Sequence, residues 1–491
     1  MGRSPNAYAL WIARVEPGVH EAILAKCPAR SPLIVPVIDC GRSTGAPELT
    51  IASIESSRAP APIILKASGS AADRASELAS LISSQGNWLC IINAGDRLAR
   101  DAIDIYSTAA ARFPDSWIIY ADDDLIGEGG RREPHFKPDW NPELFEHHDF
   151  ITGSAIIRST SDMLGELANS RSEDWQATLV RAALKRGPPV HLPVVLHHRA
   201  SRPDPFVPSK PPLLAAKISP LVSIIVPTRN RLSLLRTCIE GVGRTAYPNV
   251  ELIVVNNDSD DPETLAYFEA LKSEGVRILD VTGAFNFSAM NNLAAKHAKG
   301  ELLCFLNNDV EVIDGDWLSL LALQAIREDI GAVGARLLYP DGTVQHAGVV
   351  TGVGGGAGHA HRYQRGEETG YFLRDRLPQR VSAVTAACLL VGKDKFFDVG
   401  GFNESDFPVA FNDVDLCLKL NARGWQSFYE PRAVLIHHES KSRGSDSAKE
   451  NRVRFAKELA ALKRHWNTDQ LRDPYHHPQL SPFCERFYVA L

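Results

Sequence analysis

The sequence lacks any hydrophobic run long enough to cross a membrane. Its longest apolar stretch, Val384–Val391, falls far short of the roughly 18–20 residues that a membrane helix needs. The first residues do not form a signal peptide, because their apolar core is short and a charge comes early. The segment Pro5-Asn6-Ala7 matches the N-terminal acylation pattern poorly. We therefore expect a cytoplasmic protein, and peripheral contact with the inner face of the membrane is compatible with this expectation.

Net positive charge and paired cysteines are also lacking. The net charge is −6, which argues against a nucleic-acid binder that depends on a basic face and leaves room only for a local basic patch. The eight cysteines contain no Cys-x-x-Cys pair, and several lie in apolar runs, as Cys304 does. We expect them to be small buried side chains in a reducing compartment.

The chain does contain enough apolar material for more than one core. Its 491 residues are 44% hydrophobic and 23% charged, and at about 100–200 residues per domain this predicts two or three domains. Residues 201–220 carry six prolines, which is typical of an extended connector. We place the domain boundary near residue 212, which divides the chain into domains of residues 1–212 and 213–491.

Short apolar strands alternate with helix patterns after the connector. We expect strands at residues 222–227, 251–256, 277–281 and 301–306, with helices at 231–243, 261–274 and 288–298 between them. This order predicts a parallel, Rossmann-like α/β sheet. The first strand runs into Pro227-Thr228-Arg229-Asn230-Arg231 and not into a G-x-G-x-x-G turn, so a dinucleotide site of the usual kind is not expected.

Three segments of the first half echo three segments of the second half in the same order. Residues 87–98 parallel 300–312, residues 172–187 parallel 411–424, and residues 192–200 parallel 431–440. Matching segments in a fixed order indicate a duplicated domain, although the early strands of the first copy are poorly defined.

Polar side chains follow the apolar strands of the second half. Asp309 closes the turn Asn307-Asn308-Asp309 after one strand, and Asn256, Asn257 and Asp258 end another. Ligands of open α/β sheets bind beyond the carboxyl ends of the strands. A carboxylate there can hold a divalent cation together with phosphate oxygens, and the amides can hydrogen-bond a nucleobase. Taken alone, each segment is explained as well or better by an ordinary polar turn.

Two later segments contain further candidates. Asp413 lies at the start of a helix pattern, where the helix dipole favours the deprotonated form that a general base needs. His437 and His438 follow a strand and can ligate a metal or bind a diphosphate, with Lys441 and Arg443 nearby to neutralise its charge. Ordinary first-turn acids and an exposed histidine pair are the simpler alternatives.

A glycine-rich segment, residues 352–363, lies between these motifs. It is not a Walker A loop, because no Lys-Ser/Thr follows it. We interpret it as a mobile loop that closes over the donor or acceptor, with His359 and His361 lining the site. A solvated flexible loop is an equally good explanation.

Seven segments that include these motifs occur in the order typical of one enzyme family. They resemble family 2 glycosyltransferases of the GT-A fold, above all those of bacterial O-antigen and surface polysaccharide synthesis. The segments are residues 222–231, 254–261, 286–312, 337–355, 400–404, 411–420 and 433–444. The resemblance implies two tandem α/β domains of the GT-A fold (Rossmann-like, nucleotide-diphospho-sugar transferase), of which the second is complete.

The resemblance implies a role for each candidate residue. Asp413 would be the catalytic base. Asp309 would be the one acid retained from a metal-binding D-x-D motif, and His438 or its neighbour His437 would assist metal and diphosphate. Asn412 stands where many relatives carry Glu, a departure shared by the subgroup that this chain most resembles. The nucleotide-binding residues would be Pro227, Thr228, Arg229, Asn256, Asn257, Asp258, Asn292 and Asn308.

The implied reaction is an inverting transfer by a hexosyl- or deoxyhexosyltransferase. Asp413 would take the proton of an acceptor hydroxyl, whose oxygen attacks the anomeric carbon as the nucleoside diphosphate leaves. Mg²⁺ or Mn²⁺ would offset the charge on the leaving group. UDP- and dTDP-linked donors both fit, and the acceptor would be a lipid-linked glycan, a growing polysaccharide or a protein. The helix expected at residues 448–466 and the tail after it would pack against the catalytic domain.

The first half resembles a degenerate copy of the same domain. Asn93 and Asp96 occupy the metal position, Glu173-Asp174 the base position, and His197-His198 match the later histidine pair. Its front end lacks the V-P-T-x-N strand end, so we expect poor donor affinity and a structural or acceptor-binding role. The alternative that the first half is a second active transferase stays open, because its acidic residues at the metal and base positions are present.

Two other functions compete with a glycosyltransferase. A nucleotidyltransferase has a similar α/β core, but it usually shows a glycine-rich basic loop where this chain has Pro227–Arg231. A non-catalytic scaffold that binds nucleotide sugar or polysaccharide would not need the acids Asp309 and Asp413.

Overall fold

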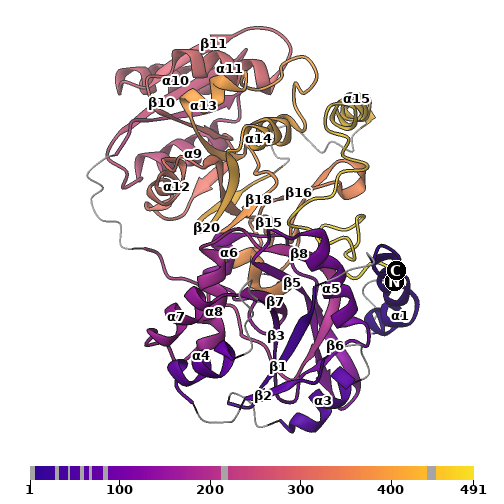
Figure 1. Ribbon diagram of the computed structural model, residues 1–491. Coiled ribbons are helices and arrows are strands. Elements are labelled where there is room, and N and C mark those ends of the chain that lie inside the picture. The colour runs from indigo at the N-terminus through magenta and orange to yellow at the C-terminus, as the bar shows by residue number, and fades with distance from the viewer. Residues whose placement is uncertain are drawn as a thin grey trace.

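Two α/β units follow one another along the chain in the computed structural model (Figure 1). The structure describes residues 6–27, 32–41, 45–55, 60–65, 69–80, 87–211, 219–365, 368, 370–439 and 449–491. Residues 200–211 of the connector contain no helix or strand. The boundary that we placed near residue 212 falls among residues 212–218, outside the described residues.

The first unit is a mixed sheet between two layers of helices. Its strands are β1 (Ile34–Asp39), β2 (Ile63–Leu65), β3 (Asn87–Asn93), β4 (Arg97–Leu98), β5 (Ile118–Gly127), β6 (Gly130–His135), β7 (Ala155–Ser159) and β8 (Val190–Arg199). Its helices are α1 (Ala7–Arg14), α2 (Glu16–Leu24), α3 (Pro47–Glu55), α4 (Ala71–Ala79), α5 (Ala102–Arg112), α6 (Pro142–Phe145), α7 (Ser161–Ala168) and α8 (Trp175–Leu184). The strand order is β2-β1-β3-β7-β5-β8-β4, with β6 paired to β5.

The second unit has a larger sheet of the same kind. Its strands are β9 (Val222–Thr228), β10 (Val250–Asn257), β11 (Arg277–Val281), β12 (Leu302–Leu306), β13 (Val310–Val312), β14 (Ile330–Leu338), β15 (Val344–His346), β18 (Gln379–Val381), β19 (Cys388–Gly392) and β20 (Gln426–His437), with a separate hairpin of β16 (Val349–Thr351) and β17 (Ala357–His359). Its helices are α9 (Leu232–Gly243), α10 (Pro262–Ser273), α11 (Phe287–His297), α12 (Trp317–Ala325), α13 (Lys393–Asp398), α14 (Asn412–Ala422) and α15 (Lys449–Trp466), with short 3₁₀ turns η1 (Val353–Gly355) and η2 (Tyr371–Arg376). The order is β11-β10-β9-β12-β19-β14-β20-β13.

The two sheets share one topology. From one edge, β4-β8-β5-β7-β3-β1-β2 matches β13-β20-β14-β19-β12-β9-β10. Each pair of neighbours also has the same relative direction in both sheets. The duplication predicted from three short sequence matches is therefore confirmed. β11 has no counterpart in the described part of the first sheet.

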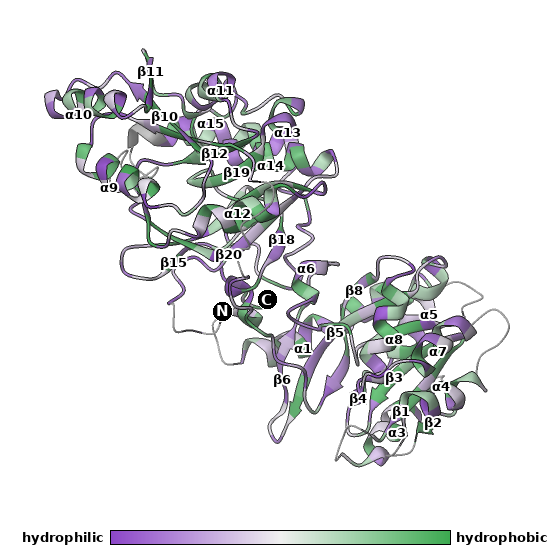
Figure 2. Cartoon of the chain, turned by 90° about the vertical axis from the view of Figure 1, so that its left-hand side faces the viewer, coloured by the Kyte–Doolittle hydropathy of each residue, from purple (hydrophilic) through white to green (hydrophobic). Residues whose placement is uncertain are grey.

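Alternate side chains of each buried strand point to opposite faces of the sheet, and this explains why a hydrophobic core lies on each face. Val222, Ile224 and Val226 of β9 face α9 and α12, whereas Ile225 faces α11 and α14. Figure 2 shows the hydrophobic strands in the middle of each unit. All eight cysteines are free, as predicted, and five of them are buried, whereas Cys27 is exposed and Cys40 and Cys484 are partly exposed. No helix of the described residues is long and apolar enough to span a membrane.

Two helices of the second unit begin directly after a residue whose side chain caps the helix N-terminus. Asp261 accepts a hydrogen bond from the N–H of Thr264 at 2.9 Å, and Pro262 opens α10. Asn286 caps α11 in the same way through the N–H of Ala289. Caps and apolar strands are local signals, so the predicted ends of the elements from β9 to β12 agree with the structure to within one residue.

The C-terminal segment, residues 467–491, joins the two units. It packs on the second unit, as predicted, where the carboxylate of Asp473 accepts the N–H and the hydroxyl of Thr351. It then crosses to the first unit, where Gln479 accepts a hydrogen bond from the indole of Trp11 at 2.9 Å. The two ends of the chain consequently lie side by side (Figures 1 and 2).

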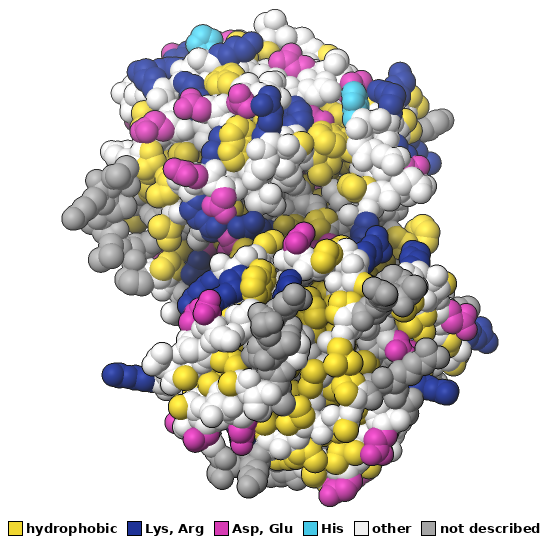
Figure 3. All heavy atoms as spheres, in the orientation of Figure 1, with side chains coloured by type: hydrophobic (Ala, Val, Ile, Leu, Met, Phe, Trp, Pro, Cys, Tyr) yellow, Lys and Arg dark blue, Asp and Glu magenta, His cyan; other side chains and the backbone are white. Residues whose placement is uncertain are grey.

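Charged contacts reinforce this junction. Nε2 of His191 lies 3.0 Å from one oxygen of Asp122, and Nε2 of His477 lies 2.7 Å from the other. Glu143 of α6 also accepts a hydrogen bond from Arg380 of the second unit at 2.8 Å. The space-filling view shows a hollow across the molecule between the units, with dark-blue Lys and Arg side chains along it (Figure 3).

Replacing His477 tests the junction. His477→Ala leaves the buried Asp122 carboxylate with one polar partner fewer, and we expect it to lower the free energy of unfolding by about 2–3 kcal/mol. Urea unfolding followed by tryptophan fluorescence measures this loss. Phe483→Ala, in the same segment but at an 84% exposed side chain, should leave the midpoint unchanged. Equal midpoints for both variants would show that His477 does not secure the junction.

Candidate active site

The carboxyl ends of three parallel strands meet in the second unit. β10, β9 and β12 are neighbours, and Asn256 of β10 pairs in register with Thr228 of β9. The amide of Asn308, just after β12, donates to the Thr228 hydroxyl at 2.8 Å. Three of the predicted nucleotide-binding residues are therefore brought together at the sheet edge where α/β proteins bind ligands.

The turn after β9 is held against the turn after β10. Asn230 adopts a left-handed conformation with φ of 52°. Its amide donates to Asp260 at 2.8 Å and accepts the N–H groups of Asp260 and Asp261. Of the three predicted residues that precede it, Pro227 and Thr228 are buried in β9 and Arg229 is exposed beyond the strand end.

The residues at the end of β10 hold the neighbouring edge of the sheet. Asn256 donates to Asp280 of β11 at 2.8 Å, and Asn257 is directed at the carbonyls of Val281 and Gly283. Asp258 is exposed, and its carboxylate accepts the N–H of Gly283 at 2.8 Å. These bonds give the turn a fixed shape, and its contact with a nucleoside stays a prediction.

Asn292 of α11 binds protein groups through both ends of its amide. Its nitrogen donates to the carbonyl of Phe402 and to the carboxylate of Glu404, both at 2.8 Å, and its oxygen accepts the N–H of Phe402 at 2.9 Å. Asn292 thus anchors the Gly-Gly-Phe-Asn-Glu segment. The structure gives it a structural task, and the predicted nucleoside contact is untested.

A buried carboxylate and a buried imidazole meet beside the end of β12. Asp309 is 4% exposed, and its Oδ1 lies 3.2 Å from Nε2 of His437. The backbone completes the contact, because the N–H of His438 donates to the carbonyl of Asp309 at 2.9 Å. Nδ1 of His437 is buried without a hydrogen-bond partner among the described residues. One oxygen and one nitrogen thus converge as a divalent cation requires.

The two neighbouring histidines do not share this position. Successive residues at a strand end point to opposite faces, and Nε2 of His438 lies 3.0 Å from Glu311 of β13. We placed His438 ahead of His437 as the metal-assisting residue, whereas the histidine that contacts Asp309 is His437. The metal role of both residues stays a prediction. Lys441 and Arg443, predicted to neutralise the diphosphate, lie outside the described residues.

Asp413 is half-buried in the first turn of α14. Its carboxylate accepts the N–H of Ala386 at 3.0 Å. Burial raises the pKa of Asp413 above its ordinary value, although hydrogen bonds from Ala386, Val414 and Thr385 act in the opposite direction. We expected the helix dipole to favour the deprotonated form of this carboxylate. Desolvation opposes that form, and a raised pKa corresponds to a more basic carboxylate.

The segment Thr385–Ala387 connects the two halves of the site. The N–H of Ala386 binds Asp413, and the carbonyl of Ala387 accepts the N–H of Asn307 at 3.0 Å. Asp413 and the Asn307-Asn308-Asp309 turn are therefore one hydrogen-bonded segment apart. Sequence reasoning missed Thr385, whose only signal was a hydroxyl within the longest apolar run.

A second charged group borders the buried pair. Glu439 lies two residues beyond His437, and Arg362 and Tyr339 both bind its carboxylate. Burial opposes the charge of Glu439, but the hydrogen bond from Tyr339 and the charge of Arg362 outweigh it and lower the pKa of Glu439. His359 belongs to the same cluster, and burial lowers its pKa to about 3. Sequence reasoning did not single out Glu439 or Arg362.

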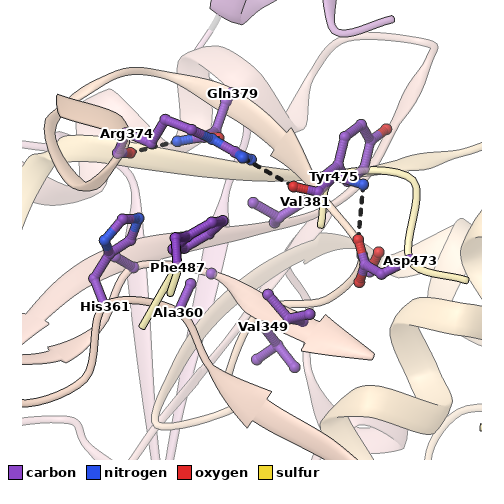
Figure 4. Close-up of a pocket in the computed structure, with 13 residues that line it drawn as sticks. Val349, Ala360, His361, Arg374, Gln379, Val381, Asp473, Tyr475 and Phe487 are labelled. Atoms are coloured by element: carbon purple, nitrogen blue, oxygen red, sulfur yellow. Dashed lines mark hydrogen bonds between the residues drawn. The ribbon is translucent and has the colours of Figure 1, made fainter. Parts of the chain in front are cut away.

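The glycine-rich segment is not the mobile loop that we expected. It forms the β16–β17 hairpin and is covered by the C-terminal segment, since the N–H of Gly354 donates to the carbonyl of Pro482 at 2.8 Å. His361 lines a small pocket below that segment (Figure 4). Arg374 forms part of the pocket wall. Its guanidinium group donates hydrogen bonds to the side-chain oxygen of Gln379 and to the carbonyl of Tyr475. The predicted donor-site residues do not line this pocket.

Comparison with known proteins identifies the second unit. Residues 223–396 match the model of the family described as Glycosyl transferase family 2. These residues contain the three strand ends and Asp309. Residues 223–396 of the second unit are therefore a family 2 glycosyltransferase domain.

Curated relatives match parts of the chain. A protein of Sinorhizobium fredii, named only uncharacterized protein y4gI, is 39% identical over 81% of this chain and 49% of its own length. The O-antigen biosynthesis protein RfbC of Myxococcus xanthus is 34% identical over 81% of this chain and 34% of its own length. An N-acetylglucosaminyl-diphospho-decaprenol L-rhamnosyltransferase of Mycobacterium tuberculosis is 34% identical over 29% of this chain and 48% of its own. The chain thus spans half or less of these relatives.

Solved structures show more distant similarity. The mannosyltransferase PcManGT of Pyrobaculum calidifontis, in complex with GDP-Man and Mn²⁺, matches with a TM-score of 0.39 and 18% identity. The match covers 53% of this chain and 68% of that one.

The first unit differs from the glycosyltransferase domain at the base position. Asp413 is the second residue of α14, and the second residue of the equivalent α8 is Gln176. We assigned this position to Glu173-Asp174, but Asp174 precedes the helix and caps it through the N–H of Ala177. The Gln176 amide donates to Asp39 and Asn93, both at 2.8 Å. A carboxamide cannot accept a proton as a base does.

The metal position of the first unit also has different surroundings. Asp96 accepts the N–H of Ala200 at 2.7 Å, and burial raises its pKa to about 6 against the opposing charge of Arg199. His197 contacts the hydroxyl of Tyr106, and His198 contacts Asp124. Neither contact is with Asp96, so the arrangement of Asp309 and His437 is not repeated.

Asp122, His191 and His477 form another cluster with metal-ligand side chains. The N–H of Gln479 donates to Nδ1 of His477 at 3.0 Å, which places the ring proton of a neutral His477 on Nε2, facing Asp122. A metal ligand would need that nitrogen without a proton. The pKa of His191 is raised, because Asp122 and Asp139 favour its charged form more than burial opposes it. We therefore interpret this cluster as a hydrogen-bonded clamp.

Substituting Asn292 distinguishes its structural task from ligand binding. Asn292→Ala leaves the buried backbone groups of Phe402 without partners, and we expect a loss of about 2 kcal/mol in the free energy of unfolding. Thermal and urea unfolding without any ligand measure it. Lys296→Ala, at an exposed position of the same helix, serves as the control. An Asn292→Ala variant as stable as the native chain would show that Asn292 does not anchor the segment of Phe402 and Glu404.

Proposed function

We propose that the glycosyltransferase domain transfers a sugar, with inversion, from a nucleotide-diphosphate donor to a glycan or lipid-linked acceptor in cell-surface polysaccharide synthesis. The observation that carries this proposal is the buried Asp309–His437 pair, one hydrogen-bonded segment away from Asp413. The names of the M. xanthus and M. tuberculosis relatives support the substrate class. UDP- and dTDP-linked donors remain the expected ones, and a division near residue 212 separates this domain from the first unit.

Asp413 acts as the general base in this proposal. It takes the proton from the acceptor hydroxyl while that oxygen forms a bond to the anomeric carbon. The bond from the anomeric carbon to the diphosphate oxygen breaks, and its electron pair leaves with the nucleoside diphosphate. The raised pKa of Asp413 favours this proton transfer, because a stronger base receives the proton more readily.

Asp309 and His437 would hold the divalent cation. Both side chains are at least nine-tenths buried, and their ligand atoms lie 3.2 Å apart. When bound, Mg²⁺ or Mn²⁺ would neutralise charge that develops on the departing diphosphate. A nitrogen ligand favours Mn²⁺, since Mg²⁺ prefers oxygen ligands. Asn308 and Thr228 would orient the nucleotide from the adjacent strand ends.

The first unit, by this proposal, does not catalyse transfer. Gln176 replaces the base, and the Asp96 carboxylate is capped by a backbone N–H. Its sheet instead supports the glycosyltransferase domain through α6 and the C-terminal segment. An acceptor-binding role on its surface is compatible with this arrangement.

Changing Asp413 tests the base. Asp413→Asn should slow sugar transfer, or donor hydrolysis in the presence of Mn²⁺, by roughly 10²–10⁴-fold. Donor binding, measured as an increase in melting temperature, should persist. In the native chain the rate should rise with pH through the raised pKa of Asp413, because only the deprotonated form acts as a base, and the variant should lose this limb. Full activity of Asp413→Asn would refute the assignment.

Metal binding can be measured without turnover. Asp309→Asn and His437→Gln should each weaken Mn²⁺ binding by at least about tenfold, since even the loss of an outer-shell partner costs that much. Calorimetry or electron paramagnetic resonance gives the affinity. His438→Gln and Asp96→Asn are the matched controls, one on the neighbouring residue and one in the first unit, and should bind as the native chain does. If His438→Gln and not His437→Gln weakens binding, the metal lies on the opposite face of β20.

A further inference from the structure

The residue before the catalytic helix has a strained backbone. Phe411, the N-cap of α14, has φ of 60° and ψ of 7°, a left-handed conformation that non-glycine residues adopt at a cost. Asp413 follows two residues later. Such strain persists only where neighbouring contacts enforce it, and it is concentrated at functional sites.

A buried carboxylate of α15 enforces this conformation. Glu458 is 2% exposed, and its two oxygens accept the N–H groups of Val409 and Ala410 at 3.2 and 2.8 Å. Both N–H groups belong to the turn that leads into Phe411. Hydrogen bonds to a buried charged acceptor are among the stronger ones in proteins. The Phe411 ring also packs on Phe455 of α15, with ring centroids 5.2 Å apart.

The other end of α15 binds the catalytic helix itself. The indole N–H of Trp466 donates to the carboxylate of Asp415 at 2.9 Å. Asp415 lies two residues after Asp413 and also pairs with Lys419 of the same helix. α15 therefore contacts the chain on both sides of Asp413, from the turn before it to the first turn after it. Figure 1 shows α15 at the outer edge of the domain.

We propose that α15 is a positioning element for the catalytic base, with Glu458 as its main contact. The carboxylate of Glu458 fixes the turn 409–411, and this turn sets the direction in which the first turn of α14 presents Asp413. Ala386 holds the Asp413 carboxylate from the opposite side. This role rests on the proposed function of Asp413, and Glu458 itself touches neither donor nor acceptor.

A conservative substitution separates positioning from folding. In Glu458→Gln one carboxylate oxygen becomes an NH₂ group, which cannot accept the N–H of Val409 or Ala410. We expect kcat to fall about tenfold to a hundredfold, the factor that corresponds to losing a charge-assisted hydrogen bond, with the donor KM within about twofold of native. The acidic limb of the pH profile should move to lower pH, because a loosened Asp413 is better hydrated and its pKa falls.

The control is Lys457→Gln, an exposed position one residue earlier on α15. It should leave kcat, the pH profile and the melting temperature unchanged. A folded Glu458→Gln with native kcat and a native acidic limb would overturn the positioning role. If Glu458→Gln does not fold, Trp466→Phe keeps the ring, removes the bond to Asp415, and should show the same shift of the acidic limb; its absence would be equally decisive.

Hydrogen exchange provides a readout without catalysis. The amides of residues 409–415 should exchange faster in Glu458→Gln than in Lys457→Gln, and equal exchange would contradict the proposal. A native chain without transfer or hydrolysis activity but with this difference in exchange would refute the proposed function and leave the contact between α15 and the turn intact.

Discussion

The antiparallel pairing of β13 with β20 is the contact on which the candidate site depends. It sets Val310 opposite His437 in register, so the residue before β13, Asp309, meets the last side chain of β20. A shift of one residue along β20 would bring His438 to that position and turn His437 to the other face. The buried carboxylate–imidazole pair therefore follows from sheet register, and the segment Thr385–Ala387 then links it to Asp413.

The duplicated unit shows how a fold persists while its site changes. Both sheets keep one strand order and the same strand directions. At the positions where the second unit has Asp413 and the Asp309–His437 contact, the first has Gln176 and an Asp96 capped by the N–H of Ala200. Apolar strands and their register maintain the architecture, whereas a few strand-end side chains determine the chemistry. The first unit retains the strand order and register but lacks most of the strand-end side chains found in the second unit.

The last part of the chain connects the turn around Asp413 to the first unit. α15 binds both sides of the base-bearing turn through Glu458 and Trp466, and residues 467–491 then continue onto the first unit, where Gln479 meets Trp11. A single stretch of chain thus runs from the turn before Asp413 to helix α1 of the first unit. This continuity gives the first unit a physical reason to be present beside a complete glycosyltransferase domain.

The sequence alone determined the features that depend on neighbours along the chain. Apolar runs predicted β9 to β12, the helix patterns between them predicted α9 to α11, and three ordered repeats predicted the duplicated domain. Only the tertiary structure decided which histidine meets Asp309, because opposite faces of a strand look alike in sequence. It also decided the direction of the Asp413 pKa shift, since burial raises this pKa more than the hydrogen bonds from Ala386, Val414 and Thr385 lower it. Thr385, Glu439 and Glu458 escaped prediction for the same reason, because their partners lie on segments far away in the chain.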